Sequence, residues 1–591
     1  MALRSLLRLG AVAGLASFGH AQGGIVVFQG PTGGVGRVVA VDETTGAANP
    51  VAPEFEALEL LPIEAAQRCT LTEWLPQSAR LGRNLGSATH LILPQARGAV
   101  YHHRRVAEDG LRYGYFLVRP AGSVALLHEQ PALLGGGDPY APKLAVSPDG
   151  AHLLAATRQA AGGDLWEIGL DGSVVNRTAA APPLRIGTDS LHLGATFGAV
   201  ATGRGFVRFA RSAGAQVALV PYAQGESQPL HFNALATSLD GALCVGIAGV
   251  SAQQAYPYVF GATGPARRAA AQPSAFTGAG FQPESGSGPH LAVSNDGTQV
   301  VWRSVVPNAF GTSGEAMLAP QGQIAPTQQV SGDAYVIDTL DEVGLFGFRI
   351  DGTLVVAIGE ATPIGEVSLQ KADLYAVTQG PSGPLFQNLS ASSGDTSVPF
   401  LAVPDWDISG ARLLPDGSGW MIEQLGATPS IEHLSFAGVR TPLLSQVRRI
   451  QWLLHDGAGV LAIVQKDSNQ RPVQAWALPA APALSPLLLA SWDSSSLAGA
   501  PATREGGTSF ALQEQGNWRL VSNQPASALQ QTTSTAGAIT APLQRTSLGG
   551  TAYTSGDGAT TGRVWIWRAG ATGPVPLGDL SGPLQILPTN S

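Results

Sequence analysis

The densest group of residues that could do chemistry is the segment Tyr101-His102-His103-Arg104-Arg105, where two imidazoles adjoin two guanidiniums. Adjacent residues of a strand point to opposite faces, so His102 and His103 are poorly placed to bind one metal ion together. His103 and Arg105 would share a face and could bind an anionic ligand. The alternative is a solvated edge strand with His102 and Arg104 outward. We take His103 and Arg105 as candidate ligand-binding residues and assign no catalytic residue.

Two acidic segments, Asp338–Glu342 and Asp405–Gly410, could supply oxygen ligands for Ca²⁺. Carboxylates in loops usually face water, so we expect no metal site and no cofactor, with Ca²⁺ as the alternative.

The linear motifs of several enzyme classes are absent from the sequence. It has no G-x-S-x-G nucleophile motif, no H-E-x-x-H, no phosphate-binding loop and no C-x-x-C. In a fold built from repeats, however, catalytic residues can be scattered one per repeat, so a missing motif does not exclude an enzyme.

The composition indicates a folded, turn-rich β protein. Of 591 residues 44% are hydrophobic and 13% are charged, with 74 Gly and 42 Pro, which favours turns over long helices. The net charge is −8 and no basic run exceeds two residues, so we expect no nucleic-acid partner.

A turn between two apolar strands is the best-defined local element. In Ser147-Pro148-Asp149-Gly150, Pro148 presets φ, Asp149 can hydrogen-bond its own backbone and Gly150 accepts a positive φ. Residues 165–170 then alternate, which places Trp166 on the face that meets the neighbouring sheet.

The same pattern of a turn between apolar runs recurs along the chain. Its Asp-Gly pairs are Asp149-Gly150, Asp240-Gly241, Asp296-Gly297, Asp351-Gly352, Asp416-Gly417 and, more weakly, Asp456-Gly457. A period of roughly 50 residues with four short strands per unit is typical of β-propeller blades.

The segment "SPDGAHLLAATRQAAGGDLWEIGLDG" resembles the WD40-like repeat of TolB-type propellers, which joins an S-P-D-G turn to a D-[LI]-[WY] strand. The other units keep the Asp-Gly turn and mostly lose that strand, and the separate α/β domain of TolB is not visible. The resemblance therefore implies an all-β propeller of four-stranded blades and no particular partner.

Dividing the chain by about 53 residues per unit gives ten or eleven blades, whereas one ring usually holds about four to eight. We favour two rings, residues 22–268 and 290–591, joined by the Gly/Pro/Ser-rich residues 269–289. The alternative is one ring of seven or eight blades with long insertions, in which "GGIVVFQG" near the start completes the sheet of "GRVWIWRAG" near the end.

Residues 1–21 have the form of a cleaved secretory signal, with Arg4 and Arg8 before an apolar run too short to span a bilayer. No later stretch is long enough either, so we expect a periplasmic or secreted protein without a membrane span. Cys69 and Cys244 could form one disulfide or lie separately as small buried side chains.

Taken together, these features predict an exported, non-enzymatic β-propeller that binds a protein, glycan or small ligand through its loop face or central funnel. One alternative is a lactonase-like or lyase-like propeller enzyme with scattered axial groups. Another is a structural module of an envelope assembly.

Overall fold

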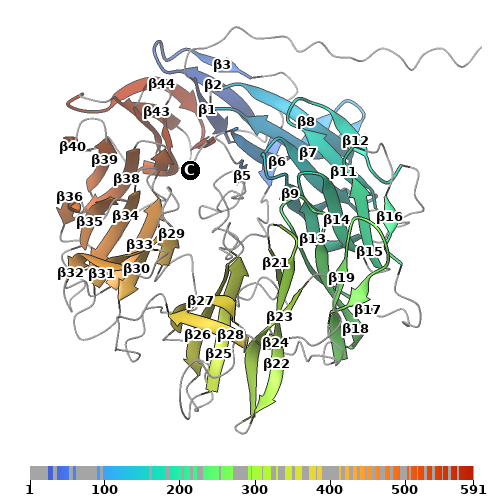
Figure 1. Cartoon of the computed structure of the whole chain (residues 1–591). Helices are drawn as coiled ribbons and strands as arrows, with labels where there is room; N and C mark the ends of the chain where they lie inside the picture. Colours follow the sequence, from blue (N-terminus) through green and yellow to red (C-terminus); the bar gives the residue numbers. More distant parts are fainter. Residues whose placement is uncertain are drawn as a thin grey trace, which may run out of the picture.

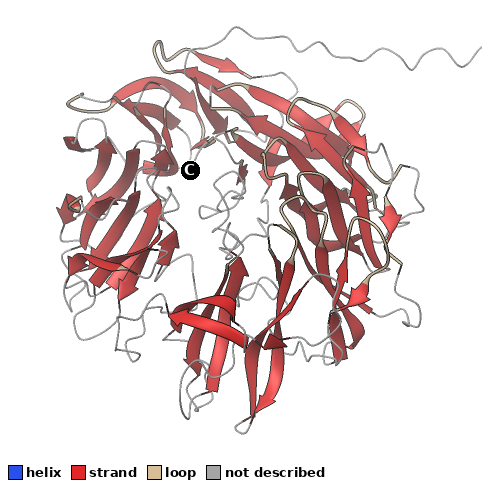
Figure 2. Ribbon diagram, viewed as in Figure 1, coloured by secondary structure: helices blue, strands red, loops and turns tan. Residues whose placement is uncertain are grey.

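In the computed structural model the chain is built from β-strands joined by turns, and Figure 2 shows no helix among the described residues. The structure describes residues 24–30, 36–51, 58–61, 90–93, 97–120, 122–158, 163–179, 186–202, 205–212, 217–221, 230–251, 254–269, 291–294, 296–308, 311–320, 328–329, 340–348, 353–361, 372–380, 383–388, 411–413, 419–424, 430–435, 439–445, 449–455, 459–465, 473–479, 484–492, 502–504, 507–514, 517–524, 529–534, 539–546, 548, 550–556, 561–568 and 571–589.

The described strands form eleven antiparallel sheets, numbered here as blades in chain order. Ten have four strands and blade 2 has five. The strands of blades 1 to 5 are β1 (Gly24–Gln29), β2 (Arg37–Asp42), β3 (Ala48–Pro50) and β45 (Leu584–Ile586); β4 (Leu58–Leu61), β5 (His90–Ile92), β6 (Ala99–Ala107), β7 (Gly110–Val118) and β8 (Val124–Pro131); β9 (Tyr140–Val146), β10 (His152–Thr157), β11 (Leu165–Gly169) and β12 (Val174–Asn176); β13 (Ile186–Leu193), β14 (Phe197–Thr202), β15 (Gly205–Ala210) and β16 (Ala218–Leu219); β17 (Leu230–Thr237), β18 (Cys244–Ser251), β19 (Gln254–Phe260) and β20 (Arg267–Arg268).

The strands of blades 6 to 11 are β21 (Leu291–Val293), β22 (Gln299–Asn308), β23 (Gly311–Pro320) and β24 (Gln328–Gln329); β25 (Leu340–Phe348), β26 (Leu354–Ala361), β27 (Ala372–Gly380) and β28 (Gly383–Asn388); β29 (Ala411–Leu413), β30 (Gly419–Gln424), β31 (Ser430–Ser435) and β32 (Arg440–Ser445); β33 (Arg449–His455), β34 (Gly459–Gln465), β35 (Val473–Pro479) and β36 (Leu487–Trp492); β37 (Ala502–Arg504), β38 (Gly507–Glu514), β39 (Asn517–Gln524) and β40 (Leu529–Ser534); β41 (Ile539–Arg545), β42 (Thr551–Gly556), β43 (Thr561–Trp567) and β44 (Val575–Ser581).

The blades follow one another in chain order around a single circle (Figure 1). This confirms the all-β propeller that the sequence predicts. The arrangement of two rings is not what the structure shows, and the one ring has eleven sheets rather than seven or eight blades. Of the proposed linker, Ala269 is buried in a core cluster shared by blades 5 and 6, and residues 270–289 lie outside the described part.

The ring closes by pairing the two ends of the described chain. β1 pairs on one side with β2 and on the other with β45, with Val27 opposite Ile586. The closing strand is therefore Leu584–Ile586 instead of the Trp-containing strand expected from the sequence. The Tyr101 hydroxyl in blade 2 donates a hydrogen bond to the Pro588 carbonyl at 2.7 Å, which holds the segment after β45 in place.

The core lies in the seams between neighbouring blades because alternate side chains of each strand face opposite sides. Val26 of β1 packs toward Phe116 of blade 2, whereas Ile25 and Val27 pack toward Val564 of blade 11. Blade 1 thus buries both faces, and its stability depends on both neighbours.

The Ser-x-Asp-Gly turns of blades 3, 5 and 6 share one hydrogen-bond pattern. In blade 3 the Ser147 hydroxyl donates to Asp149 Oδ1 at 2.5 Å and accepts from the His152 N–H at 2.9 Å. Ser238 with Asp240, and Ser294 with Asp296, repeat the first contact at 2.6 and 2.7 Å. Gly150, Gly241 and Gly297 have φ of 66°, 76° and 68°, which only glycine adopts without strain.

Several arginine side chains donate to backbone carbonyls of the next blade around the ring. These contacts are Arg119 to Leu170 (3.0 Å), Arg177 to Arg211 (2.7 Å), Arg208 to Gly261 (2.5 Å) and Arg568 to Glu43 (2.6 Å). The last contact spans the closure between blades 11 and 1.

Several sequence predictions fall on residues outside the described part. They are the signal segment 1–21, the turns at Asp351-Gly352, Asp416-Gly417 and Asp456-Gly457, the acidic segment Asp405–Gly410, the start of the acidic segment Asp338–Glu342, and Cys69. Cys244 is described as a buried free thiol whose pKa is raised by burial.

Candidate functional site

Two polar clusters lie in neighbouring seams at opposite ends of blade 3. The "His–Asp cluster" (His102, Tyr115, His128, Asp138 and Tyr140) lies where the chain enters β9 from blade 2. The "Arg–Glu cluster" (His152, Glu167, Arg177 and Arg211) lies beside the turn at the other end of β9. The register fixes these ends, because Tyr140 pairs with Thr157 and Val146 with Leu153 next to the turn.

The predicted ligand-binding residues both contact a carboxylate of their own blade. His103 is buried, and its Nε2 lies 2.8 Å from Glu129 Oε1. Arg105 donates from Nε and Nη2 to the two Glu129 oxygens at 2.6 and 2.7 Å. The structure therefore brings His103 and Arg105 together around Glu129 of β8.

The ionisation of this group follows from competing effects. Burial would raise the pKa of Glu129, but hydrogen bonds from His103 and Arg105 hold it at about 2. Burial lowers the pKa of His103 more strongly than Glu129 raises it. Glu129 therefore remains charged across the physiological range and fixes both partners.

His102 faces the other seam and belongs to the His–Asp cluster. Its ring stacks on Tyr115 with centroids 4.9 Å apart, and its Nε2 lies 3.3 Å from Asp138 Oδ2. The second Asp138 oxygen, Oδ1, accepts the Tyr140 backbone N–H at 2.9 Å. The hydrogen bond from the Tyr140 N–H thus orients the carboxyl of Asp138, whose other oxygen lies beside the His102 ring.

Asp138 is the carboxyl in this cluster that titrates near neutrality. Burial raises its pKa to about 6, against smaller lowering effects of the Tyr140 N–H and of Arg158. Its side chain still retains 33% of its exposure, whereas that of His102 retains 6%. A proton can therefore pass between this carboxyl and a molecule in solvent.

The remaining groups of the His–Asp cluster are held neutral. Burial lowers the pKa of His128 to about 4 and raises that of Tyr140 well above its ordinary value. The Tyr140 hydroxyl and His128 Nδ1 are hydrogen-bonded to each other at 2.6 Å. His128 also packs on the Trp166 ring, with centroids 4.5 Å apart, so Trp166 lies in the seam between blades 2 and 3.

A glycine-rich loop delivers Asp138 to this position. Gly135 and Gly136 have φ of 91° and 83°, and the Tyr113 hydroxyl donates to the Gly136 carbonyl at 2.7 Å. Leu134 at its tip is fully exposed. The sequence reasoning missed Asp138, and the signal was the run Gly-Gly-Gly-Asp-Pro between two strands.

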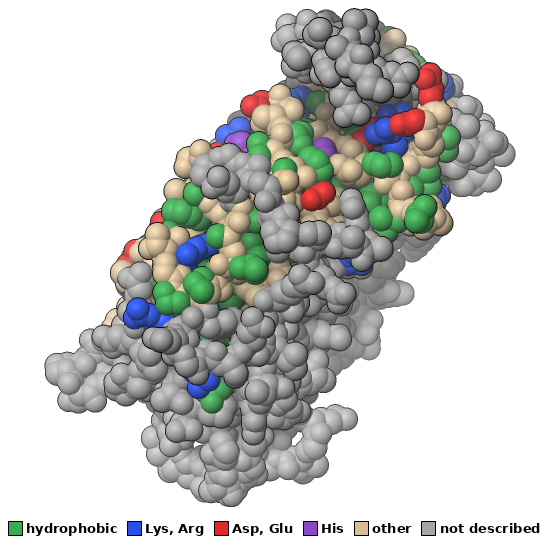
Figure 3. Space-filling view, turned by 90° about the vertical axis from the view of Figure 1, so that its right-hand side faces the viewer, with side chains coloured by type: hydrophobic (Ala, Val, Ile, Leu, Met, Phe, Trp, Pro, Cys, Tyr) green, Lys and Arg blue, Asp and Glu red, His purple; other side chains and the backbone are tan. Residues whose placement is uncertain are grey.

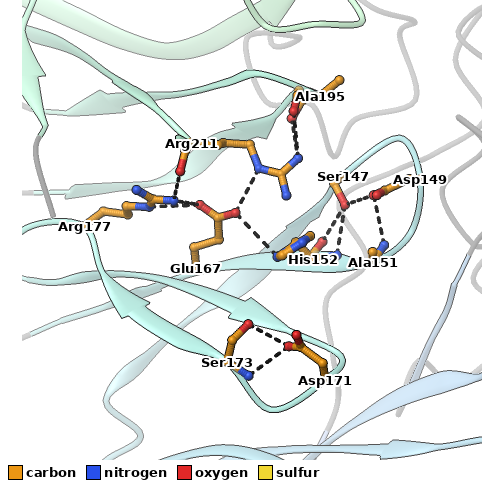
Figure 4. Close-up of polar contacts among 11 residues, drawn as sticks. Ser147, Asp149, Ala151, His152, Glu167, Asp171, Ser173, Arg177, Ala195 and Arg211 are labelled. Carbon is orange, nitrogen blue, oxygen red and sulfur yellow. Dashed lines mark hydrogen bonds and ion pairs between the residues drawn. The ribbon is translucent and has the colours of Figure 1, made fainter. Parts of the chain in front are cut away.

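In the Arg–Glu cluster, the carboxylate is paired with arginine side chains (Figure 4). Glu167 of β11 accepts from Arg177 at 2.6 Å and from Arg211 at 2.9 Å, and its side chain is 5% exposed. His152 Nδ1 lies 3.6 Å from Glu167 Oε1. Arg211 of blade 4 also donates to the Ala195 carbonyl of its own blade at 3.0 Å, so its contact with Glu167 joins blade 3 to blade 4.

Neither cluster forms a metal site of the usual kind. Among the described residues, no three His, Cys, Asp or Glu side chains converge as metal ligands. Likewise, no helix in the described part of the chain has the length and apolarity of a membrane span. In Figure 3, acidic, basic and apolar side chains are interspersed over the described part of the face shown.

No family model and no curated protein matches the chain. Several solved structures resemble it in fold. A puromycin-hydrolyzing peptidase from Mycobacterium tuberculosis has 13% identity and a TM-score of 0.31, with 78% of this chain and 60% of the peptidase covered. The tricorn protease has 10% identity and a TM-score of 0.26, with 95% of this chain and 57% of the protease covered. A protein described as TolB from Agrobacterium tumefaciens has 11% identity and a TM-score of 0.24, with 46% of this chain and 86% of that protein covered.

The chain spans at most about three fifths of the length of the peptidases that it matches. Because hydrolases are prominent among these structures, they contradict the expectation of a non-enzymatic scaffold, and we abandon that interpretation. At such identities the likeness concerns the type of fold alone and transfers no residue.

Proposed function

We propose that the chain is a propeller enzyme that hydrolyses an ester or lactone, with Asp138 as the general base. The observation that carries this proposal is the placement of a partly exposed carboxyl 3.3 Å from a buried imidazole, with a pKa of about 6. General bases are most effective when their pKa lies near the working pH.

The proton transfers balance without a further reactant. The Asp138 carboxylate takes a proton from water as the water oxygen bonds to the acyl carbon. The tetrahedral intermediate then expels the alkoxide as the carbon–oxygen bond breaks, and Asp138 returns the proton to that leaving oxygen. The Tyr140 N–H keeps the carboxyl oriented through both transfers, with the His102 ring beside its other oxygen.

The strength of this base favours esters and lactones over amides. A carboxylate with a pKa of about 6 is a weak base, and the sequence has no G-x-S-x-G motif that would supply a nucleophilic serine. Acyl groups with an oxygen leaving group need less assistance than amides do, since an alkoxide leaves more readily than an amine anion.

The test is hydrolysis of a panel of aryl esters and lactones by the full chain and two variants. We expect Asp138→Asn to lower kcat by about 10²–10⁴-fold, the range of general acid–base catalysis. Asp109→Asn is the matched control, because Asp109 is an exposed residue of blade 2 that pairs with Arg112. The proposal fails if Asp138→Asn hydrolyses the panel as fast as Asp109→Asn does.

The pH dependence gives an independent check. The rate should fall about tenfold per pH unit below about pH 6, where Asp138 becomes protonated and cannot accept a proton. A rate unchanged between about pH 4 and 7 would assign the base to another group.

We also propose that the enzyme acts outside the cytoplasm. The support is the sequence of residues 1–21, with its basic start and short apolar run. N-terminal sequencing of the protein recovered from the source cells tests this, and we expect it to begin near Gln22.

A further inference from the structure

A cationic side chain lies next to the proposed base. Arg158 follows directly on β10, whose Thr157 pairs with Tyr140 of β9, and the Arg158 backbone N–H donates to the Pro139 carbonyl at 2.6 Å. These contacts place the backbone of Arg158 beside Pro139, the residue that follows Asp138. The positive charge of Arg158 also lowers the pKa of Asp138, against the larger effect of burial.

Arg158 is exposed, and no hydrogen bond or ion pair to its guanidinium is found within the described residues. The other arginines near this seam have partners. Arg105 binds Glu129, Arg112 binds Asp109, and Arg119 donates to the Leu170 carbonyl. Arg158 is therefore the arginine of this region whose donors are available to a bound molecule.

An anionic group on the substrate fits this arrangement. A guanidinium can donate two parallel hydrogen bonds to one carboxylate, which fixes both the position and the orientation of the bound group. Without a cation, the charged Asp138 would repel an anionic substrate at neutral pH.

We propose that Arg158 binds a carboxylate of the substrate, so that the enzyme acts on acidic esters or lactones. This inference rests on the proposed function, because it assigns the substrate class of the same site. Arg158 acts in binding, and the proton transfers remain with Asp138.

The first experiment compares two esters, the mono-4-nitrophenyl ester of succinate and the neutral 4-nitrophenyl acetate. We expect Arg158→Gln to raise KM about tenfold for the anionic ester, a ratio that corresponds to about 1.4 kcal/mol, with kcat nearly unchanged. The KM for the neutral ester should not change. Arg267→Gln is the control, because Arg267 is an exposed arginine of blade 5. An equal effect of Arg158→Gln on both esters would overturn the inference.

The second experiment measures binding of succinate, which cannot react, by titration calorimetry at neutral pH. Succinate should bind the wild-type chain and Arg267→Gln alike, and Arg158→Gln about tenfold more weakly. If the esters are not hydrolysed and succinate still binds through Arg158, the proposed function fails and the anion site stands. If hydrolysis depends on Asp138 and succinate binding does not depend on Arg158, the anion site fails and the proposed function stands.

Discussion

The two clusters of blade 3 both contain histidine and a carboxyl group, but the carboxyl groups have different partners. In the Arg–Glu cluster, one buried carboxylate is paired with two guanidiniums. In the His–Asp cluster, the carboxyl meets an imidazole among tyrosines, and its pKa rises to about 6. The ion pairs of the first seam join two blades. The carboxyl of the second seam, which forms no ion pair with an arginine within the described residues, is a group able to exchange protons near neutral pH.

The largest test of this difference is the substitution Glu167→Gln. It leaves Arg177 and Arg211 facing each other with no anion between them, and Arg177 is 4% exposed. We expect the free energy of unfolding to fall by about 3–5 kcal/mol, the usual cost of removing one partner of a buried ion pair. Urea denaturation measures this.

The matched control for Glu167→Gln is Glu59→Gln. Glu59 pairs with Arg104, and both side chains of that pair are exposed. Its loss should cost about 1 kcal/mol or less. Equal effects of the two substitutions would mean that the Arg–Glu cluster does not stabilise the seam.

An effect of intermediate magnitude is expected from Glu129, whose contribution to folding stability is lost in acid. The pKa of Glu129 is about 2 in the folded chain and about 4.3 in an unfolded chain, so its contribution is present above about pH 4.3 and is lost as pH falls toward 2. We expect a loss of roughly 2–3 kcal/mol over that window.

The Glu129→Gln variant isolates this contribution, because the amide that replaces the carboxyl cannot titrate. The difference in stability between the wild type and Glu129→Gln should shrink as the pH is lowered from about 5 to about 2. Chemical denaturation of both at several pH values would detect it, and a constant difference would show that His103 and Arg105 do not hold Glu129 charged.

The smallest expected effect on folding stability is that of Asp138, and its sign is opposite to that of Glu129. Because the folded-state pKa of Asp138 is raised, its ionisation costs stability as pH rises from about 4 to above 6. The change Asp138→Asn should stabilise the fold at about pH 8 by up to about 1 kcal/mol, since the side chain is partly exposed, and should be neutral at about pH 4. Thermal denaturation at the two pH values separates this result from a structural role, which would make the variant less stable at both.

The repeat was predictable because its turns are local. Ser147, Asp149 and Gly150 contact residues within five positions, so the sequence alone specifies their geometry, and Ser238 and Ser294 repeat it. The number of rings was not predictable, because it depends on whether β1 pairs with a strand at the far end of the chain. A Gly/Pro/Ser-rich segment does not reveal that pairing.

The candidate site was only partly predictable for a similar reason. The sequence drew attention to Tyr101–Arg105, but it could not show that His103 and Arg105 are both hydrogen-bonded to Glu129. Its signal for Asp138 was the run Gly-Gly-Gly-Asp-Pro, which does not show that burial between two blades raises the pKa of this carboxyl. The excess of Arg over Lys, 31 to 3, also acquires a partial structural meaning in the guanidiniums that bridge blades.

The closure of blade 1 has a consequence for how the chain reaches its folded state. During synthesis β1 is made long before its partner β45 and before the Pro588 carbonyl, which is 487 residues from Tyr101. Until then one edge of β1 is unpaired and open to pairing with other chains.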